Sequence, residues 1–325
     1  MLSGGLGGAR VALALKLGGL DAAACFVTNV GDDLSVDGLL VCPDTDAVLY
    51  ALAGLFDEDR GWGIRDDVFP AAGAGPDRWF NLGERDYAHH ARRRSLLDSG
   101  LGPAAATARL AGDLGVVARV VPATDDDVRT YVVTGHGVLA WQEWLVRDRA
   151  EPVPIGVEYR GAGSASPNHD AVAALSDADL VLIAPSSPIA SVAPILAIPG
   201  FADVLRDRLR RGVGGAGSGA DRAPACRTVA VSPVVSRRPL VTERDRHRAR
   251  ARAALLAARG RDHTPAAVAD LYRDLVDTFV LDPADAADCE AVGAAAGTGM
   301  AVVVAPAPTT TVEGLEALVR TLLAS

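Results

Sequence analysis

The sequence predicts an α/β protein with a Rossmann-like, largely parallel sheet flanked by helices. Short apolar, β-branched segments recur along the 325 residues and alternate with Ala-, Leu- and Arg-rich stretches of helical spacing. Apolar runs without polar alternation are typical of strands that are buried on both faces, as in parallel sheets. With 49% hydrophobic residues, the chain can bury a large core. We therefore expect one domain over residues 1–325.

The elements follow one another in this alternation. Strands are predicted at 24–30, 115–124, 130–134, 179–187, 228–235, 278–282 and 300–306. Helices are predicted at 104–113, 170–177, 201–211, 245–259 and 312–324. Residues 57–100 break the pattern, because they are rich in Trp, Arg, Asp and His, and they predict a mostly helical insertion or cap. The stretch "GVGGAGSGA" (212–220) predicts a surface loop that does not divide domains.

The first strand is incomplete in the sequence. The glycine-rich stretch "GGLGGAR" (4–10) leads into a helical segment, but only Met1, Leu2 and Ser3 precede it. We expect either that the true start lies upstream or that the sheet is incomplete and less stable at this position.

Composition excludes several classes of function. A formal net charge of −9 argues against a broad nucleic-acid surface. No segment has the length and apolar content of a membrane span, and the first residues show no n-region and h-region, so we expect no signal peptide. The four cysteines are scattered, without CxxC or metal-finger spacing, which indicates free thiols. We expect a cytoplasmic protein.

The glycine stretch has the chemistry of a phosphate loop. Backbone N–H groups at a helix N-terminus attract phosphate, and Arg10 could reach such a ligand. The stretch is neither a Walker A loop, since no GK[ST] follows, nor a GxGxxG fingerprint, since the second strand ends in Asn29 rather than an acidic residue. The alternative is a glycine-rich turn selected for close packing.

Carboxylates gather after the second strand. Asn29, Asp32 and Asp33 follow that strand, while Asp44 and Asp46 stand just before a helix. Such carboxylates either cap a helix or hold a divalent cation that bridges phosphate oxygens. Capping accounts for one of them more easily than for all, so metal or substrate binding is the favoured interpretation.

The stretch 78–97 combines aromatic, acidic, His and Arg residues. Arg85 and the run 92–94 could meet an anionic substrate, although an amphipathic helix explains the same pattern. His89 and His90 are adjacent, so we expect them to point to different sides of a helix and to make a poor metal pair.

Two further loops share a strand–Ser–Pro pattern. "APSSPIASVAPIL" (184–196) places Ser186, Ser187 and Ser191 around a helix start, and "VSPVV" (231–235) repeats the theme with Ser232 and Pro233. Both loops and the glycine stretch could converge on one ligand with several phosphates. The sequence contains no GxSxG motif and no cysteine in a recognisable reactive context, which argues against nucleophilic catalysis.

Taken together, these stretches resemble the CofD/FbiA family of 2-phospho-L-lactate or phosphoenolpyruvate transferases. The resemblance runs in order through most of the chain, as these segments show: "GGLGGAR", "NVGDD", "GLLVCPDTDAVLYALAG", "GWGIRDDVF", "WFNLGERDYAHH", "ARVVPATDDDVRTYVVT", "WQEWLVR", "ADLVLIAPSSPIASVAPILAIPG", "AVSPVV" and "DTFVLD". The joint occurrence of these segments makes the resemblance far more specific than any single motif would.

The resemblance implies a Mg²⁺-assisted transferase. Such an enzyme moves a phospholactyl- or phosphoenolpyruvyl-type group from a GDP-activated diphosphate to the terminal hydroxyl of the deazaflavin Fo and releases GMP. It further implies a homodimer. The implied catalytic residues are Asp44, Asp46 and Arg85, with Asp44 and Asp46 near the metal and Asp44 as the group that orients or deprotonates the hydroxyl. The expected donor-binding residues are Gly4, Gly5, Gly7, Gly8, Arg10, Asn29, Asp32, Ser186, Ser187, Ser191, Ser232 and Pro233.

Some positions depart from the family pattern. His89-His90 replaces a Thr-His pair, and Ser187 replaces an asparagine that could contact a base or phosphate. The stretch 236–248 loses a glycine and gains Arg237 and Arg238, which would suit a more anionic donor or form a solvated charge run. Two alternatives therefore stay open: a paralogue with another donor or acceptor in specialised metabolism, and a YvcK-like, non-catalytic nucleotide-sugar-binding regulator.

Overall fold

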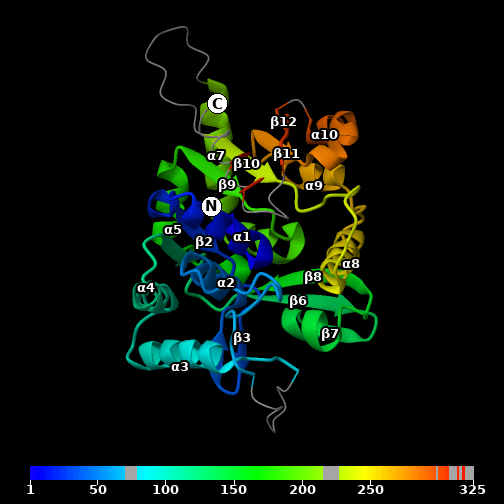
Figure 1. The fold of residues 1–325 in the computed structure, drawn as a ribbon. Helices are drawn as coiled ribbons and strands as arrows, with labels where there is room; N and C mark the ends of the chain where they lie inside the picture. The colour runs from blue at the N-terminus through cyan, green and yellow to red at the C-terminus, as the bar shows by residue number, and fades with distance from the viewer. Residues whose placement is uncertain (70–78, 215–226, 298, 307–312, 315–316, 319–325) are drawn as a thin grey trace.

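The computed structural model confirms an α/β fold built on a parallel sheet (Figure 1). It describes all residues except 70–78, 215–226, 298, 307–312, 315–316 and 319–325. The main sheet has seven strands in the order β12-β11-β10-β9-β1-β2-β5, and every neighbouring pair is parallel. Its strands are β1 (Leu2–Ser3), β2 (Cys25–Thr28), β5 (Arg119–Pro122), β9 (Leu180–Ile183), β10 (Arg227–Val231), β11 (Thr278–Leu281) and β12 (Ala301–Val304).

The strand order contains one reversal, and it lies between β1 and β9. From β1 the chain proceeds outward through β2 to β5, and then returns to the other side of β1 with β9, β10, β11 and β12. In open parallel sheets, ligands bind in the crevice beyond the carboxyl ends of the strands at such a reversal. The segments that leave β1 and β9 are the glycine stretch and the first Ser-Pro loop. The topology therefore brings together two of the three predicted phosphate loops.

Helices cover both faces of the sheet (Figure 1). One apolar cluster joins the sheet to α1 (Gly5–Leu17), α2 (Pro43–Leu52), α3 (Glu84–Asp98) and α4 (Pro103–Asp113). A second cluster joins it to α5 (His169–Asp177), α6 (Ala193–Leu196), α7 (Phe201–Gly214), α9 (Pro265–Leu271) and α10 (Cys289–Ala296). Successive strand residues alternate between the clusters, as Phe26 and Val27 do, which is why most positions of these strands are apolar.

Two small antiparallel units lie outside the main sheet. β6 (Arg129–Thr134) pairs with β7 (Gly137–Ala140) and β8 (Pro154–Arg160), and β3 (Leu34–Val36) pairs with β4 (Leu39–Val41). The strand predicted at 130–134 is thus present, but in a separate sheet. α8 (Glu243–Ala257) packs near β8.

The stretch 57–100 is helical in its second half. In the described part of this stretch, α3 is the helix. Residues 57–69 form turns, which are held by a β-bridge between Phe56 and Ile64. The loop expected at 212–220 begins later, because α7 continues to Gly214, and the rest lies outside the described residues. The helix expected at 312–324 also lies largely outside them.

Within the described ranges, no single helix has the length and apolar content needed to cross a membrane. The segments Pro188–Leu196 and Phe201–Arg211 reach that length only together, and they are bent by 86°.

Candidate active site

The glycine stretch forms the start of α1 directly after β1. Gly4 is extended (φ −164°) and caps the helix, and Gly5 has φ +55°, a conformation that favours glycine. A Cβ on Gly4 would overlap the carboxylate of Asp44 and the side chain of Ser191. The absence of side chains at this turn is therefore what allows Asp44 to approach the helix N-terminus, where the backbone dipole attracts negative charge.

The glycine loop and the first Ser-Pro loop are joined by Ser186. Its buried hydroxyl accepts from the N–H of Gly4 (3.2 Å) and donates to the carbonyl of the same residue (2.7 Å). Gly7 packs so closely on this loop that a Cβ would overlap the carbonyl of Pro185. Gly8 is equally close to the side chain of Ser3. Gly7 and Gly8 therefore allow the close packing that was one interpretation of the glycine stretch, while Gly4 and Gly5 border Asp44.

Asn29 is the polar centre between the two loops. Its side-chain amide donates to Asp32 Oδ1 (2.8 Å) and Asp44 Oδ2 (3.0 Å), and it also lies 3.3 Å from the carbonyl of Ala190. Its Oδ1 accepts from the N–H of Gly31 (2.8 Å). Asn29 is fully buried and follows β2, so the backbone holds it rigidly. It fixes two carboxylates in one place.

Asp32 and Asp44 form a buried carboxylate pair. Burial raises the pKa of Asp32 well above its ordinary value, and the charges of Asp44 and Asp33 raise it further. Burial also raises the pKa of Asp44, although hydrogen bonds from Asn29, Asp32, the Gly5 backbone and Ser191 oppose that shift. Two adjacent carboxylates that resist ionisation can share a proton, or they can both ionise against a cation.

Asp46 has a different environment, although it lies on the same turn of α2. Arg93 of α3 binds both of its oxygens, and the N–H of Cys42 donates to Oδ2 (3.1 Å). Burial alone would raise the pKa of Asp46, but Arg93, His89 and His90 hold it far below its usual range. Asp46 is therefore a helix cap and a buried ion-pair partner at the same time.

The histidine pair does not behave as the sequence indicated. His89 Nε2 lies 3.1 Å from Asp46 Oδ1, and His90 Nδ1 lies 3.6 Å from Asp46 Oδ2, so both rings face the same carboxylate. The expectation that they point to different sides was wrong, because Asp46 lies close to both rings and turns one oxygen toward each. His90 also reaches Asp86 through Nε2 (3.1 Å). The motif serves to attach α3 to α2.

The remaining predicted residues lie in the two Ser-Pro loops: Ser187 and Ser191 in the first, and Ser232 and Pro233 in the second. Ser187 caps the π-helical turn Pro188–Val192 by accepting from the N–H of Ala190 (3.2 Å), and Ser191 lies beside Gly4 and Asp44. Ser232 closes its own turn through Val234, and the carbonyl of Pro233 accepts from Arg252.

Arg85 lies apart from this cluster. It is exposed at the start of α3, where its N–H donates to Asp67 (2.9 Å) and its guanidinium donates to the carbonyl of Arg65 (3.2 Å). Gln142 was not expected from the sequence, yet its buried amide donates to Asp32 Oδ2 (3.4 Å). Only the fold, which brings the segment after β7 against the carboxylates, could reveal it.

A divalent cation fits the carboxylate pair better than the two aspartates of α2. Asp32 and Asp44 supply hard oxygen ligands side by side in a buried place, while the oxygens of Asp46 are already engaged by Arg93. Among the described residues, no group of three His, Cys, Asp or Glu side chains could hold a metal alone. A cation here would need ligand oxygens from a substrate, which is how Mg²⁺ is commonly held beside phosphates.

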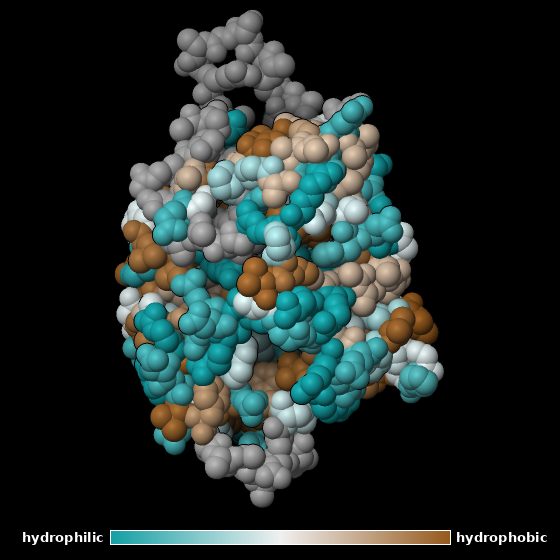
Figure 2. Space-filling view, turned by 45° about the vertical axis from the view of Figure 1, so that its right-hand side comes forward, coloured by the Kyte–Doolittle hydropathy of each residue, from teal (hydrophilic) through white to brown (hydrophobic). Residues whose placement is uncertain are grey.

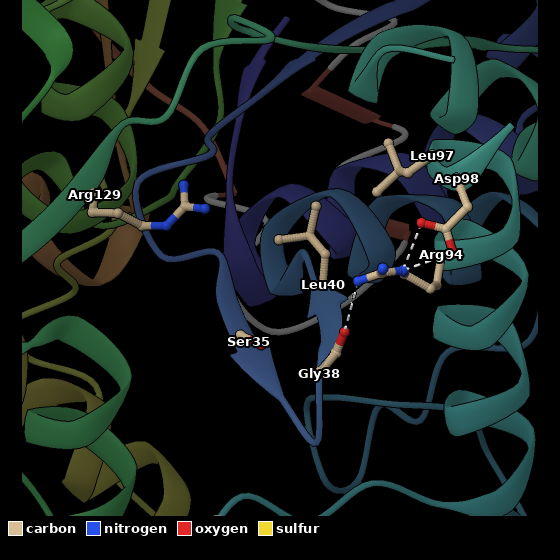
Figure 3. Close-up of a pocket in the computed structure, with 7 residues that line it drawn as sticks. All are labelled: Ser35, Gly38, Leu40, Arg94, Leu97, Asp98 and Arg129. Atoms are coloured by element: carbon tan, nitrogen blue, oxygen red, sulfur yellow. Dashed lines mark hydrogen bonds and ion pairs between the residues drawn. The ribbon is translucent and has the colours of Figure 1, made fainter. Parts of the chain in front are cut away.

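A cavity of about 350 Å³ lies elsewhere, between the β3–β4 hairpin and α3 (Figure 3). It is lined by Ser35, Gly38, Leu40, Arg94, Leu97, Asp98 and Arg129. Arg94 reaches from α3 toward the hairpin and contacts Asp98 and the carbonyl of Gly38. None of the predicted site residues lines this cavity, so we do not place the site there.

The fold and the site define a Rossmann-like α/β protein whose polar cluster lies at the reversal of the parallel sheet, between a glycine loop and a serine loop. The model of one family, described as 2-phospho-L-lactate transferase CofD, matches residues 1–214. The chain belongs to the CofD family and so to the transferases.

Relatives of known name agree with this assignment. The chain is 34% identical over 297 residues to a phosphoenolpyruvate transferase of Streptomyces coelicolor, covering 88% of this chain and 85% of that protein. It is 36% identical over 307 residues to a protein of the same name from Mycobacterium tuberculosis, covering 87% and 85%. A solved structure of a UPF0052 family member from Bacillus halodurans is similar in fold, with a TM-score of 0.60, 14% identity, and coverage of 97% and 96%.

Proposed function

We propose that the protein transfers a phosphoenolpyruvyl- or phospholactyl-type group from a GDP-activated donor to the terminal hydroxyl of the deazaflavin Fo. The acceptor oxygen would bond to the phosphorus that carries the acid unit, the bond from that phosphorus to the bridging oxygen would break, and GMP would leave with this oxygen. The name of the relatives, phosphoenolpyruvate transferase, supports the type of group that is moved.

The observation that carries the proposal is the position of Asp44. Its carboxylate is buried, lies at the N-terminus of α1, and has a raised pKa because of burial. A carboxylate with these properties can orient the acceptor hydroxyl and take its proton as the new bond forms. Backbone N–H groups of the glycine loop would meet the charge on the phosphate oxygens.

Mg²⁺ would be held by Asp32 and Asp44 together with donor oxygens, and when bound it would neutralise charge on the diphosphate. Asn29 would keep both carboxylates in place, and Gln142 would position Asp32. Catalysis of this kind depends mainly on positioning and charge neutralisation. We therefore propose Asp44 as the catalytic residue and assign Asp46 a positioning role through α2.

The test is to incubate the purified protein with Fo, Mg²⁺ and a GDP-linked phosphoenolpyruvyl or phospholactyl donor, and to measure GMP and product by mass spectrometry. We expect turnover that depends on Mg²⁺ and that Asp44→Asn lowers by about 10²- to 10⁴-fold. Asp113→Asn, at an exposed ion pair with Arg92, is the matched control and should keep full turnover.

Three results would contradict the proposal. Turnover of the Asp44→Asn variant at the wild-type rate would remove Asp44 from the chemistry. Absence of product with every donor, combined with tight nucleotide binding, would instead favour the non-catalytic regulator. Product from another alcohol but not from Fo would identify a paralogue with a different acceptor.

A further inference from the structure

Helix α8 carries two rows of arginines with opposite surroundings. The outer row, Arg246 and Arg250, is exposed and pairs with Glu243 at 2.9 and 3.0 Å. The other row, which we call the inner arginine row, consists of Arg244, Arg248 and Arg252. Its members are four residues apart and therefore share one face of the helix. This face is half-buried.

The inner arginine row donates to backbone carbonyls. Arg248 donates to the carbonyl of Gly61 (2.9 Å), and Arg252 donates to that of Pro233. Arg244 contacts the carbonyls of Glu58 and Asp59 and lies 3.4 Å from Asp245 Oδ1, yet its Nε has no hydrogen-bond partner in the described part of the chain. Within the same part, no carboxylate lies at ion-pair distance from Arg248 or Arg252, in contrast to the outer row.

The charges of this row repel one another. Burial first, and then the neighbouring charges of Arg244, Arg10 and Arg252, lower the pKa of Arg248 to about 10. Burial likewise lowers the pKa of Arg252 to about 10. Buried charges are normally paired, because an unpaired one loses its hydration without compensation. A cluster of mutually repelling, half-buried guanidinium groups is a site that an anion would complete.

The position of the inner arginine row in the fold agrees with an anion-binding site. Pro233 follows β10, at the carboxyl edge of the sheet that also carries the glycine loop. The charge of Asp44 is close enough to act on Arg248, and that of Arg244 acts on Arg10 of α1. Figure 2 brings forward the side of the molecule on which α8 lies in Figure 1, and it shows hydrophilic residues over much of that side.

We propose that the inner arginine row, together with Arg10, binds the diphosphate of the nucleotide-linked donor. The assignment rests on the proposed function for the identity of the donor, but the anion site itself is defined by the arginines. Planar guanidinium groups match phosphate oxygens in a bidentate manner, and three of them along one helix face suit an extended polyanion better than a single phosphate. α8 lies beyond the residues that the CofD family model matches.

The test uses inorganic diphosphate as the probe, without divalent cations, so that Asp32 and Asp44 cannot contribute a metal. Binding is measured by calorimetry for the full-length wild type and for Arg248→Gln, Arg252→Gln and the outer-row control Arg250→Gln. We expect each inner variant to weaken binding by about tenfold or more, and Arg250→Gln to leave it within about twofold. Wild-type affinity should fall steeply with added salt.

A second measurement separates anion binding from a structural role. Arg248→Gln gives up the contact with the carbonyl of Gly61 but also removes a half-buried, repelling charge, so this variant should unfold at the wild-type temperature or higher when no ligand is present. A merely structural arginine would instead lower that temperature and leave diphosphate affinity unchanged, which would overturn the proposal. Arg248→Lys, which keeps the charge, should recover part of the affinity, and no recovery together with unchanged Arg252→Gln binding would also contradict it.

Failure of this proposal is distinguishable from failure of the proposed function. If the wild type forms product and the inner variants keep its KM for the donor, the arginine assignment is wrong while the transferase stands. If the wild type binds diphosphate through the row but forms no product, the transferase proposal fails alone.

Discussion

Asp44 and Asp46 have identical side chains, but their surroundings shift their pKa values in opposite directions. They stand two positions apart in the first turn of α2, yet the pKa of Asp44 is raised and that of Asp46 is lowered. Asp44 lacks a cationic partner at hydrogen-bond distance among its described contacts, whereas Arg93 binds Asp46 directly. The sequence motif predicts two acidic residues of one kind, and the structure separates a catalytic candidate from a structural one.

At the residue scale, we predict opposite effects for the same substitution at two glycines. Gly7→Ala should destabilise the protein, because its Cβ would overlap the carbonyl of Pro185. Gly112→Ala, near the end of α4 with nothing within 4 Å of the new Cβ, should stabilise it by up to about 1 kcal/mol. Urea unfolding of both variants measures the difference, and equal free energies of unfolding would contradict the close packing of the two loops.

A second residue-scale prediction concerns pH. Burial raises the pKa of Asp33 to about 7, and its Oδ1 has no hydrogen-bond partner in the described chain. A carboxyl with a folded-state pKa above its unfolded value costs stability as pH rises from about 4 to 7, by at most about 4 kcal/mol. Asp33→Asn should therefore gain stability over the wild type across this window and keep a constant advantage above it.

Urea unfolding at several pH values between 4 and 8 tests this. A difference between Asp33→Asn and the wild type that does not change with pH would show that Asp33 is ionised with its ordinary pKa in the folded protein.

At the element scale, the contact between α2 and α3 depends on one buried ion pair. Arg93 is 2% exposed and binds Asp46, and neighbouring histidines complete the network. Removing one partner leaves the other charge buried and unpaired, so Arg93→Met should cost about 3–5 kcal/mol. Arg92→Met, which breaks the exposed pair with Asp113, should cost less than about 1 kcal/mol.

Denaturant unfolding at pH 7 compares these two variants. Because Asp46 ionises more readily in the folded state, its contribution is present at neutral pH and is lost as pH falls below the usual aspartate range. A loss in Arg93→Met no larger than in Arg92→Met would show that α3 is held by its apolar contacts alone.

Elements were predicted from the sequence more reliably than the faces that they present. The periodicity of α8 places it at 245–259, and the helix is found at Glu243–Ala257. It carries arginines at every second position from 244 to 252, however, so spacing alone gives two equivalent rows. Only packing shows that Arg248 is turned inward while Arg250 pairs with Glu243.

At the scale of the whole molecule, the parallel sheet was predicted but its order was not. Buried strands have a clear local pattern, since each is apolar on both faces. The position of a strand in the sheet depends on contacts far along the chain, and the strand at 130–134 has the same composition as those of the main sheet although it pairs elsewhere. The convergence of the glycine stretch with the first Ser-Pro loop was expected from the sequence, whereas the contribution of Gln142 was not.

The central place of β1 has a consequence for how the protein folds. Leu2 pairs with Val27 on one side and with Ile183 on the other, so the two halves of the sheet meet at a strand of two residues. The second pairing closes a loop of roughly 180 residues, and such distant contacts form late and slowly. During synthesis, the first half of the sheet must wait with an open edge until β9 has left the ribosome. Because Gly4 and Ser186 meet only at that closure, the polar cluster between the two loops forms only once β9 has joined the sheet, and a nascent chain that stops short of β9 lacks it.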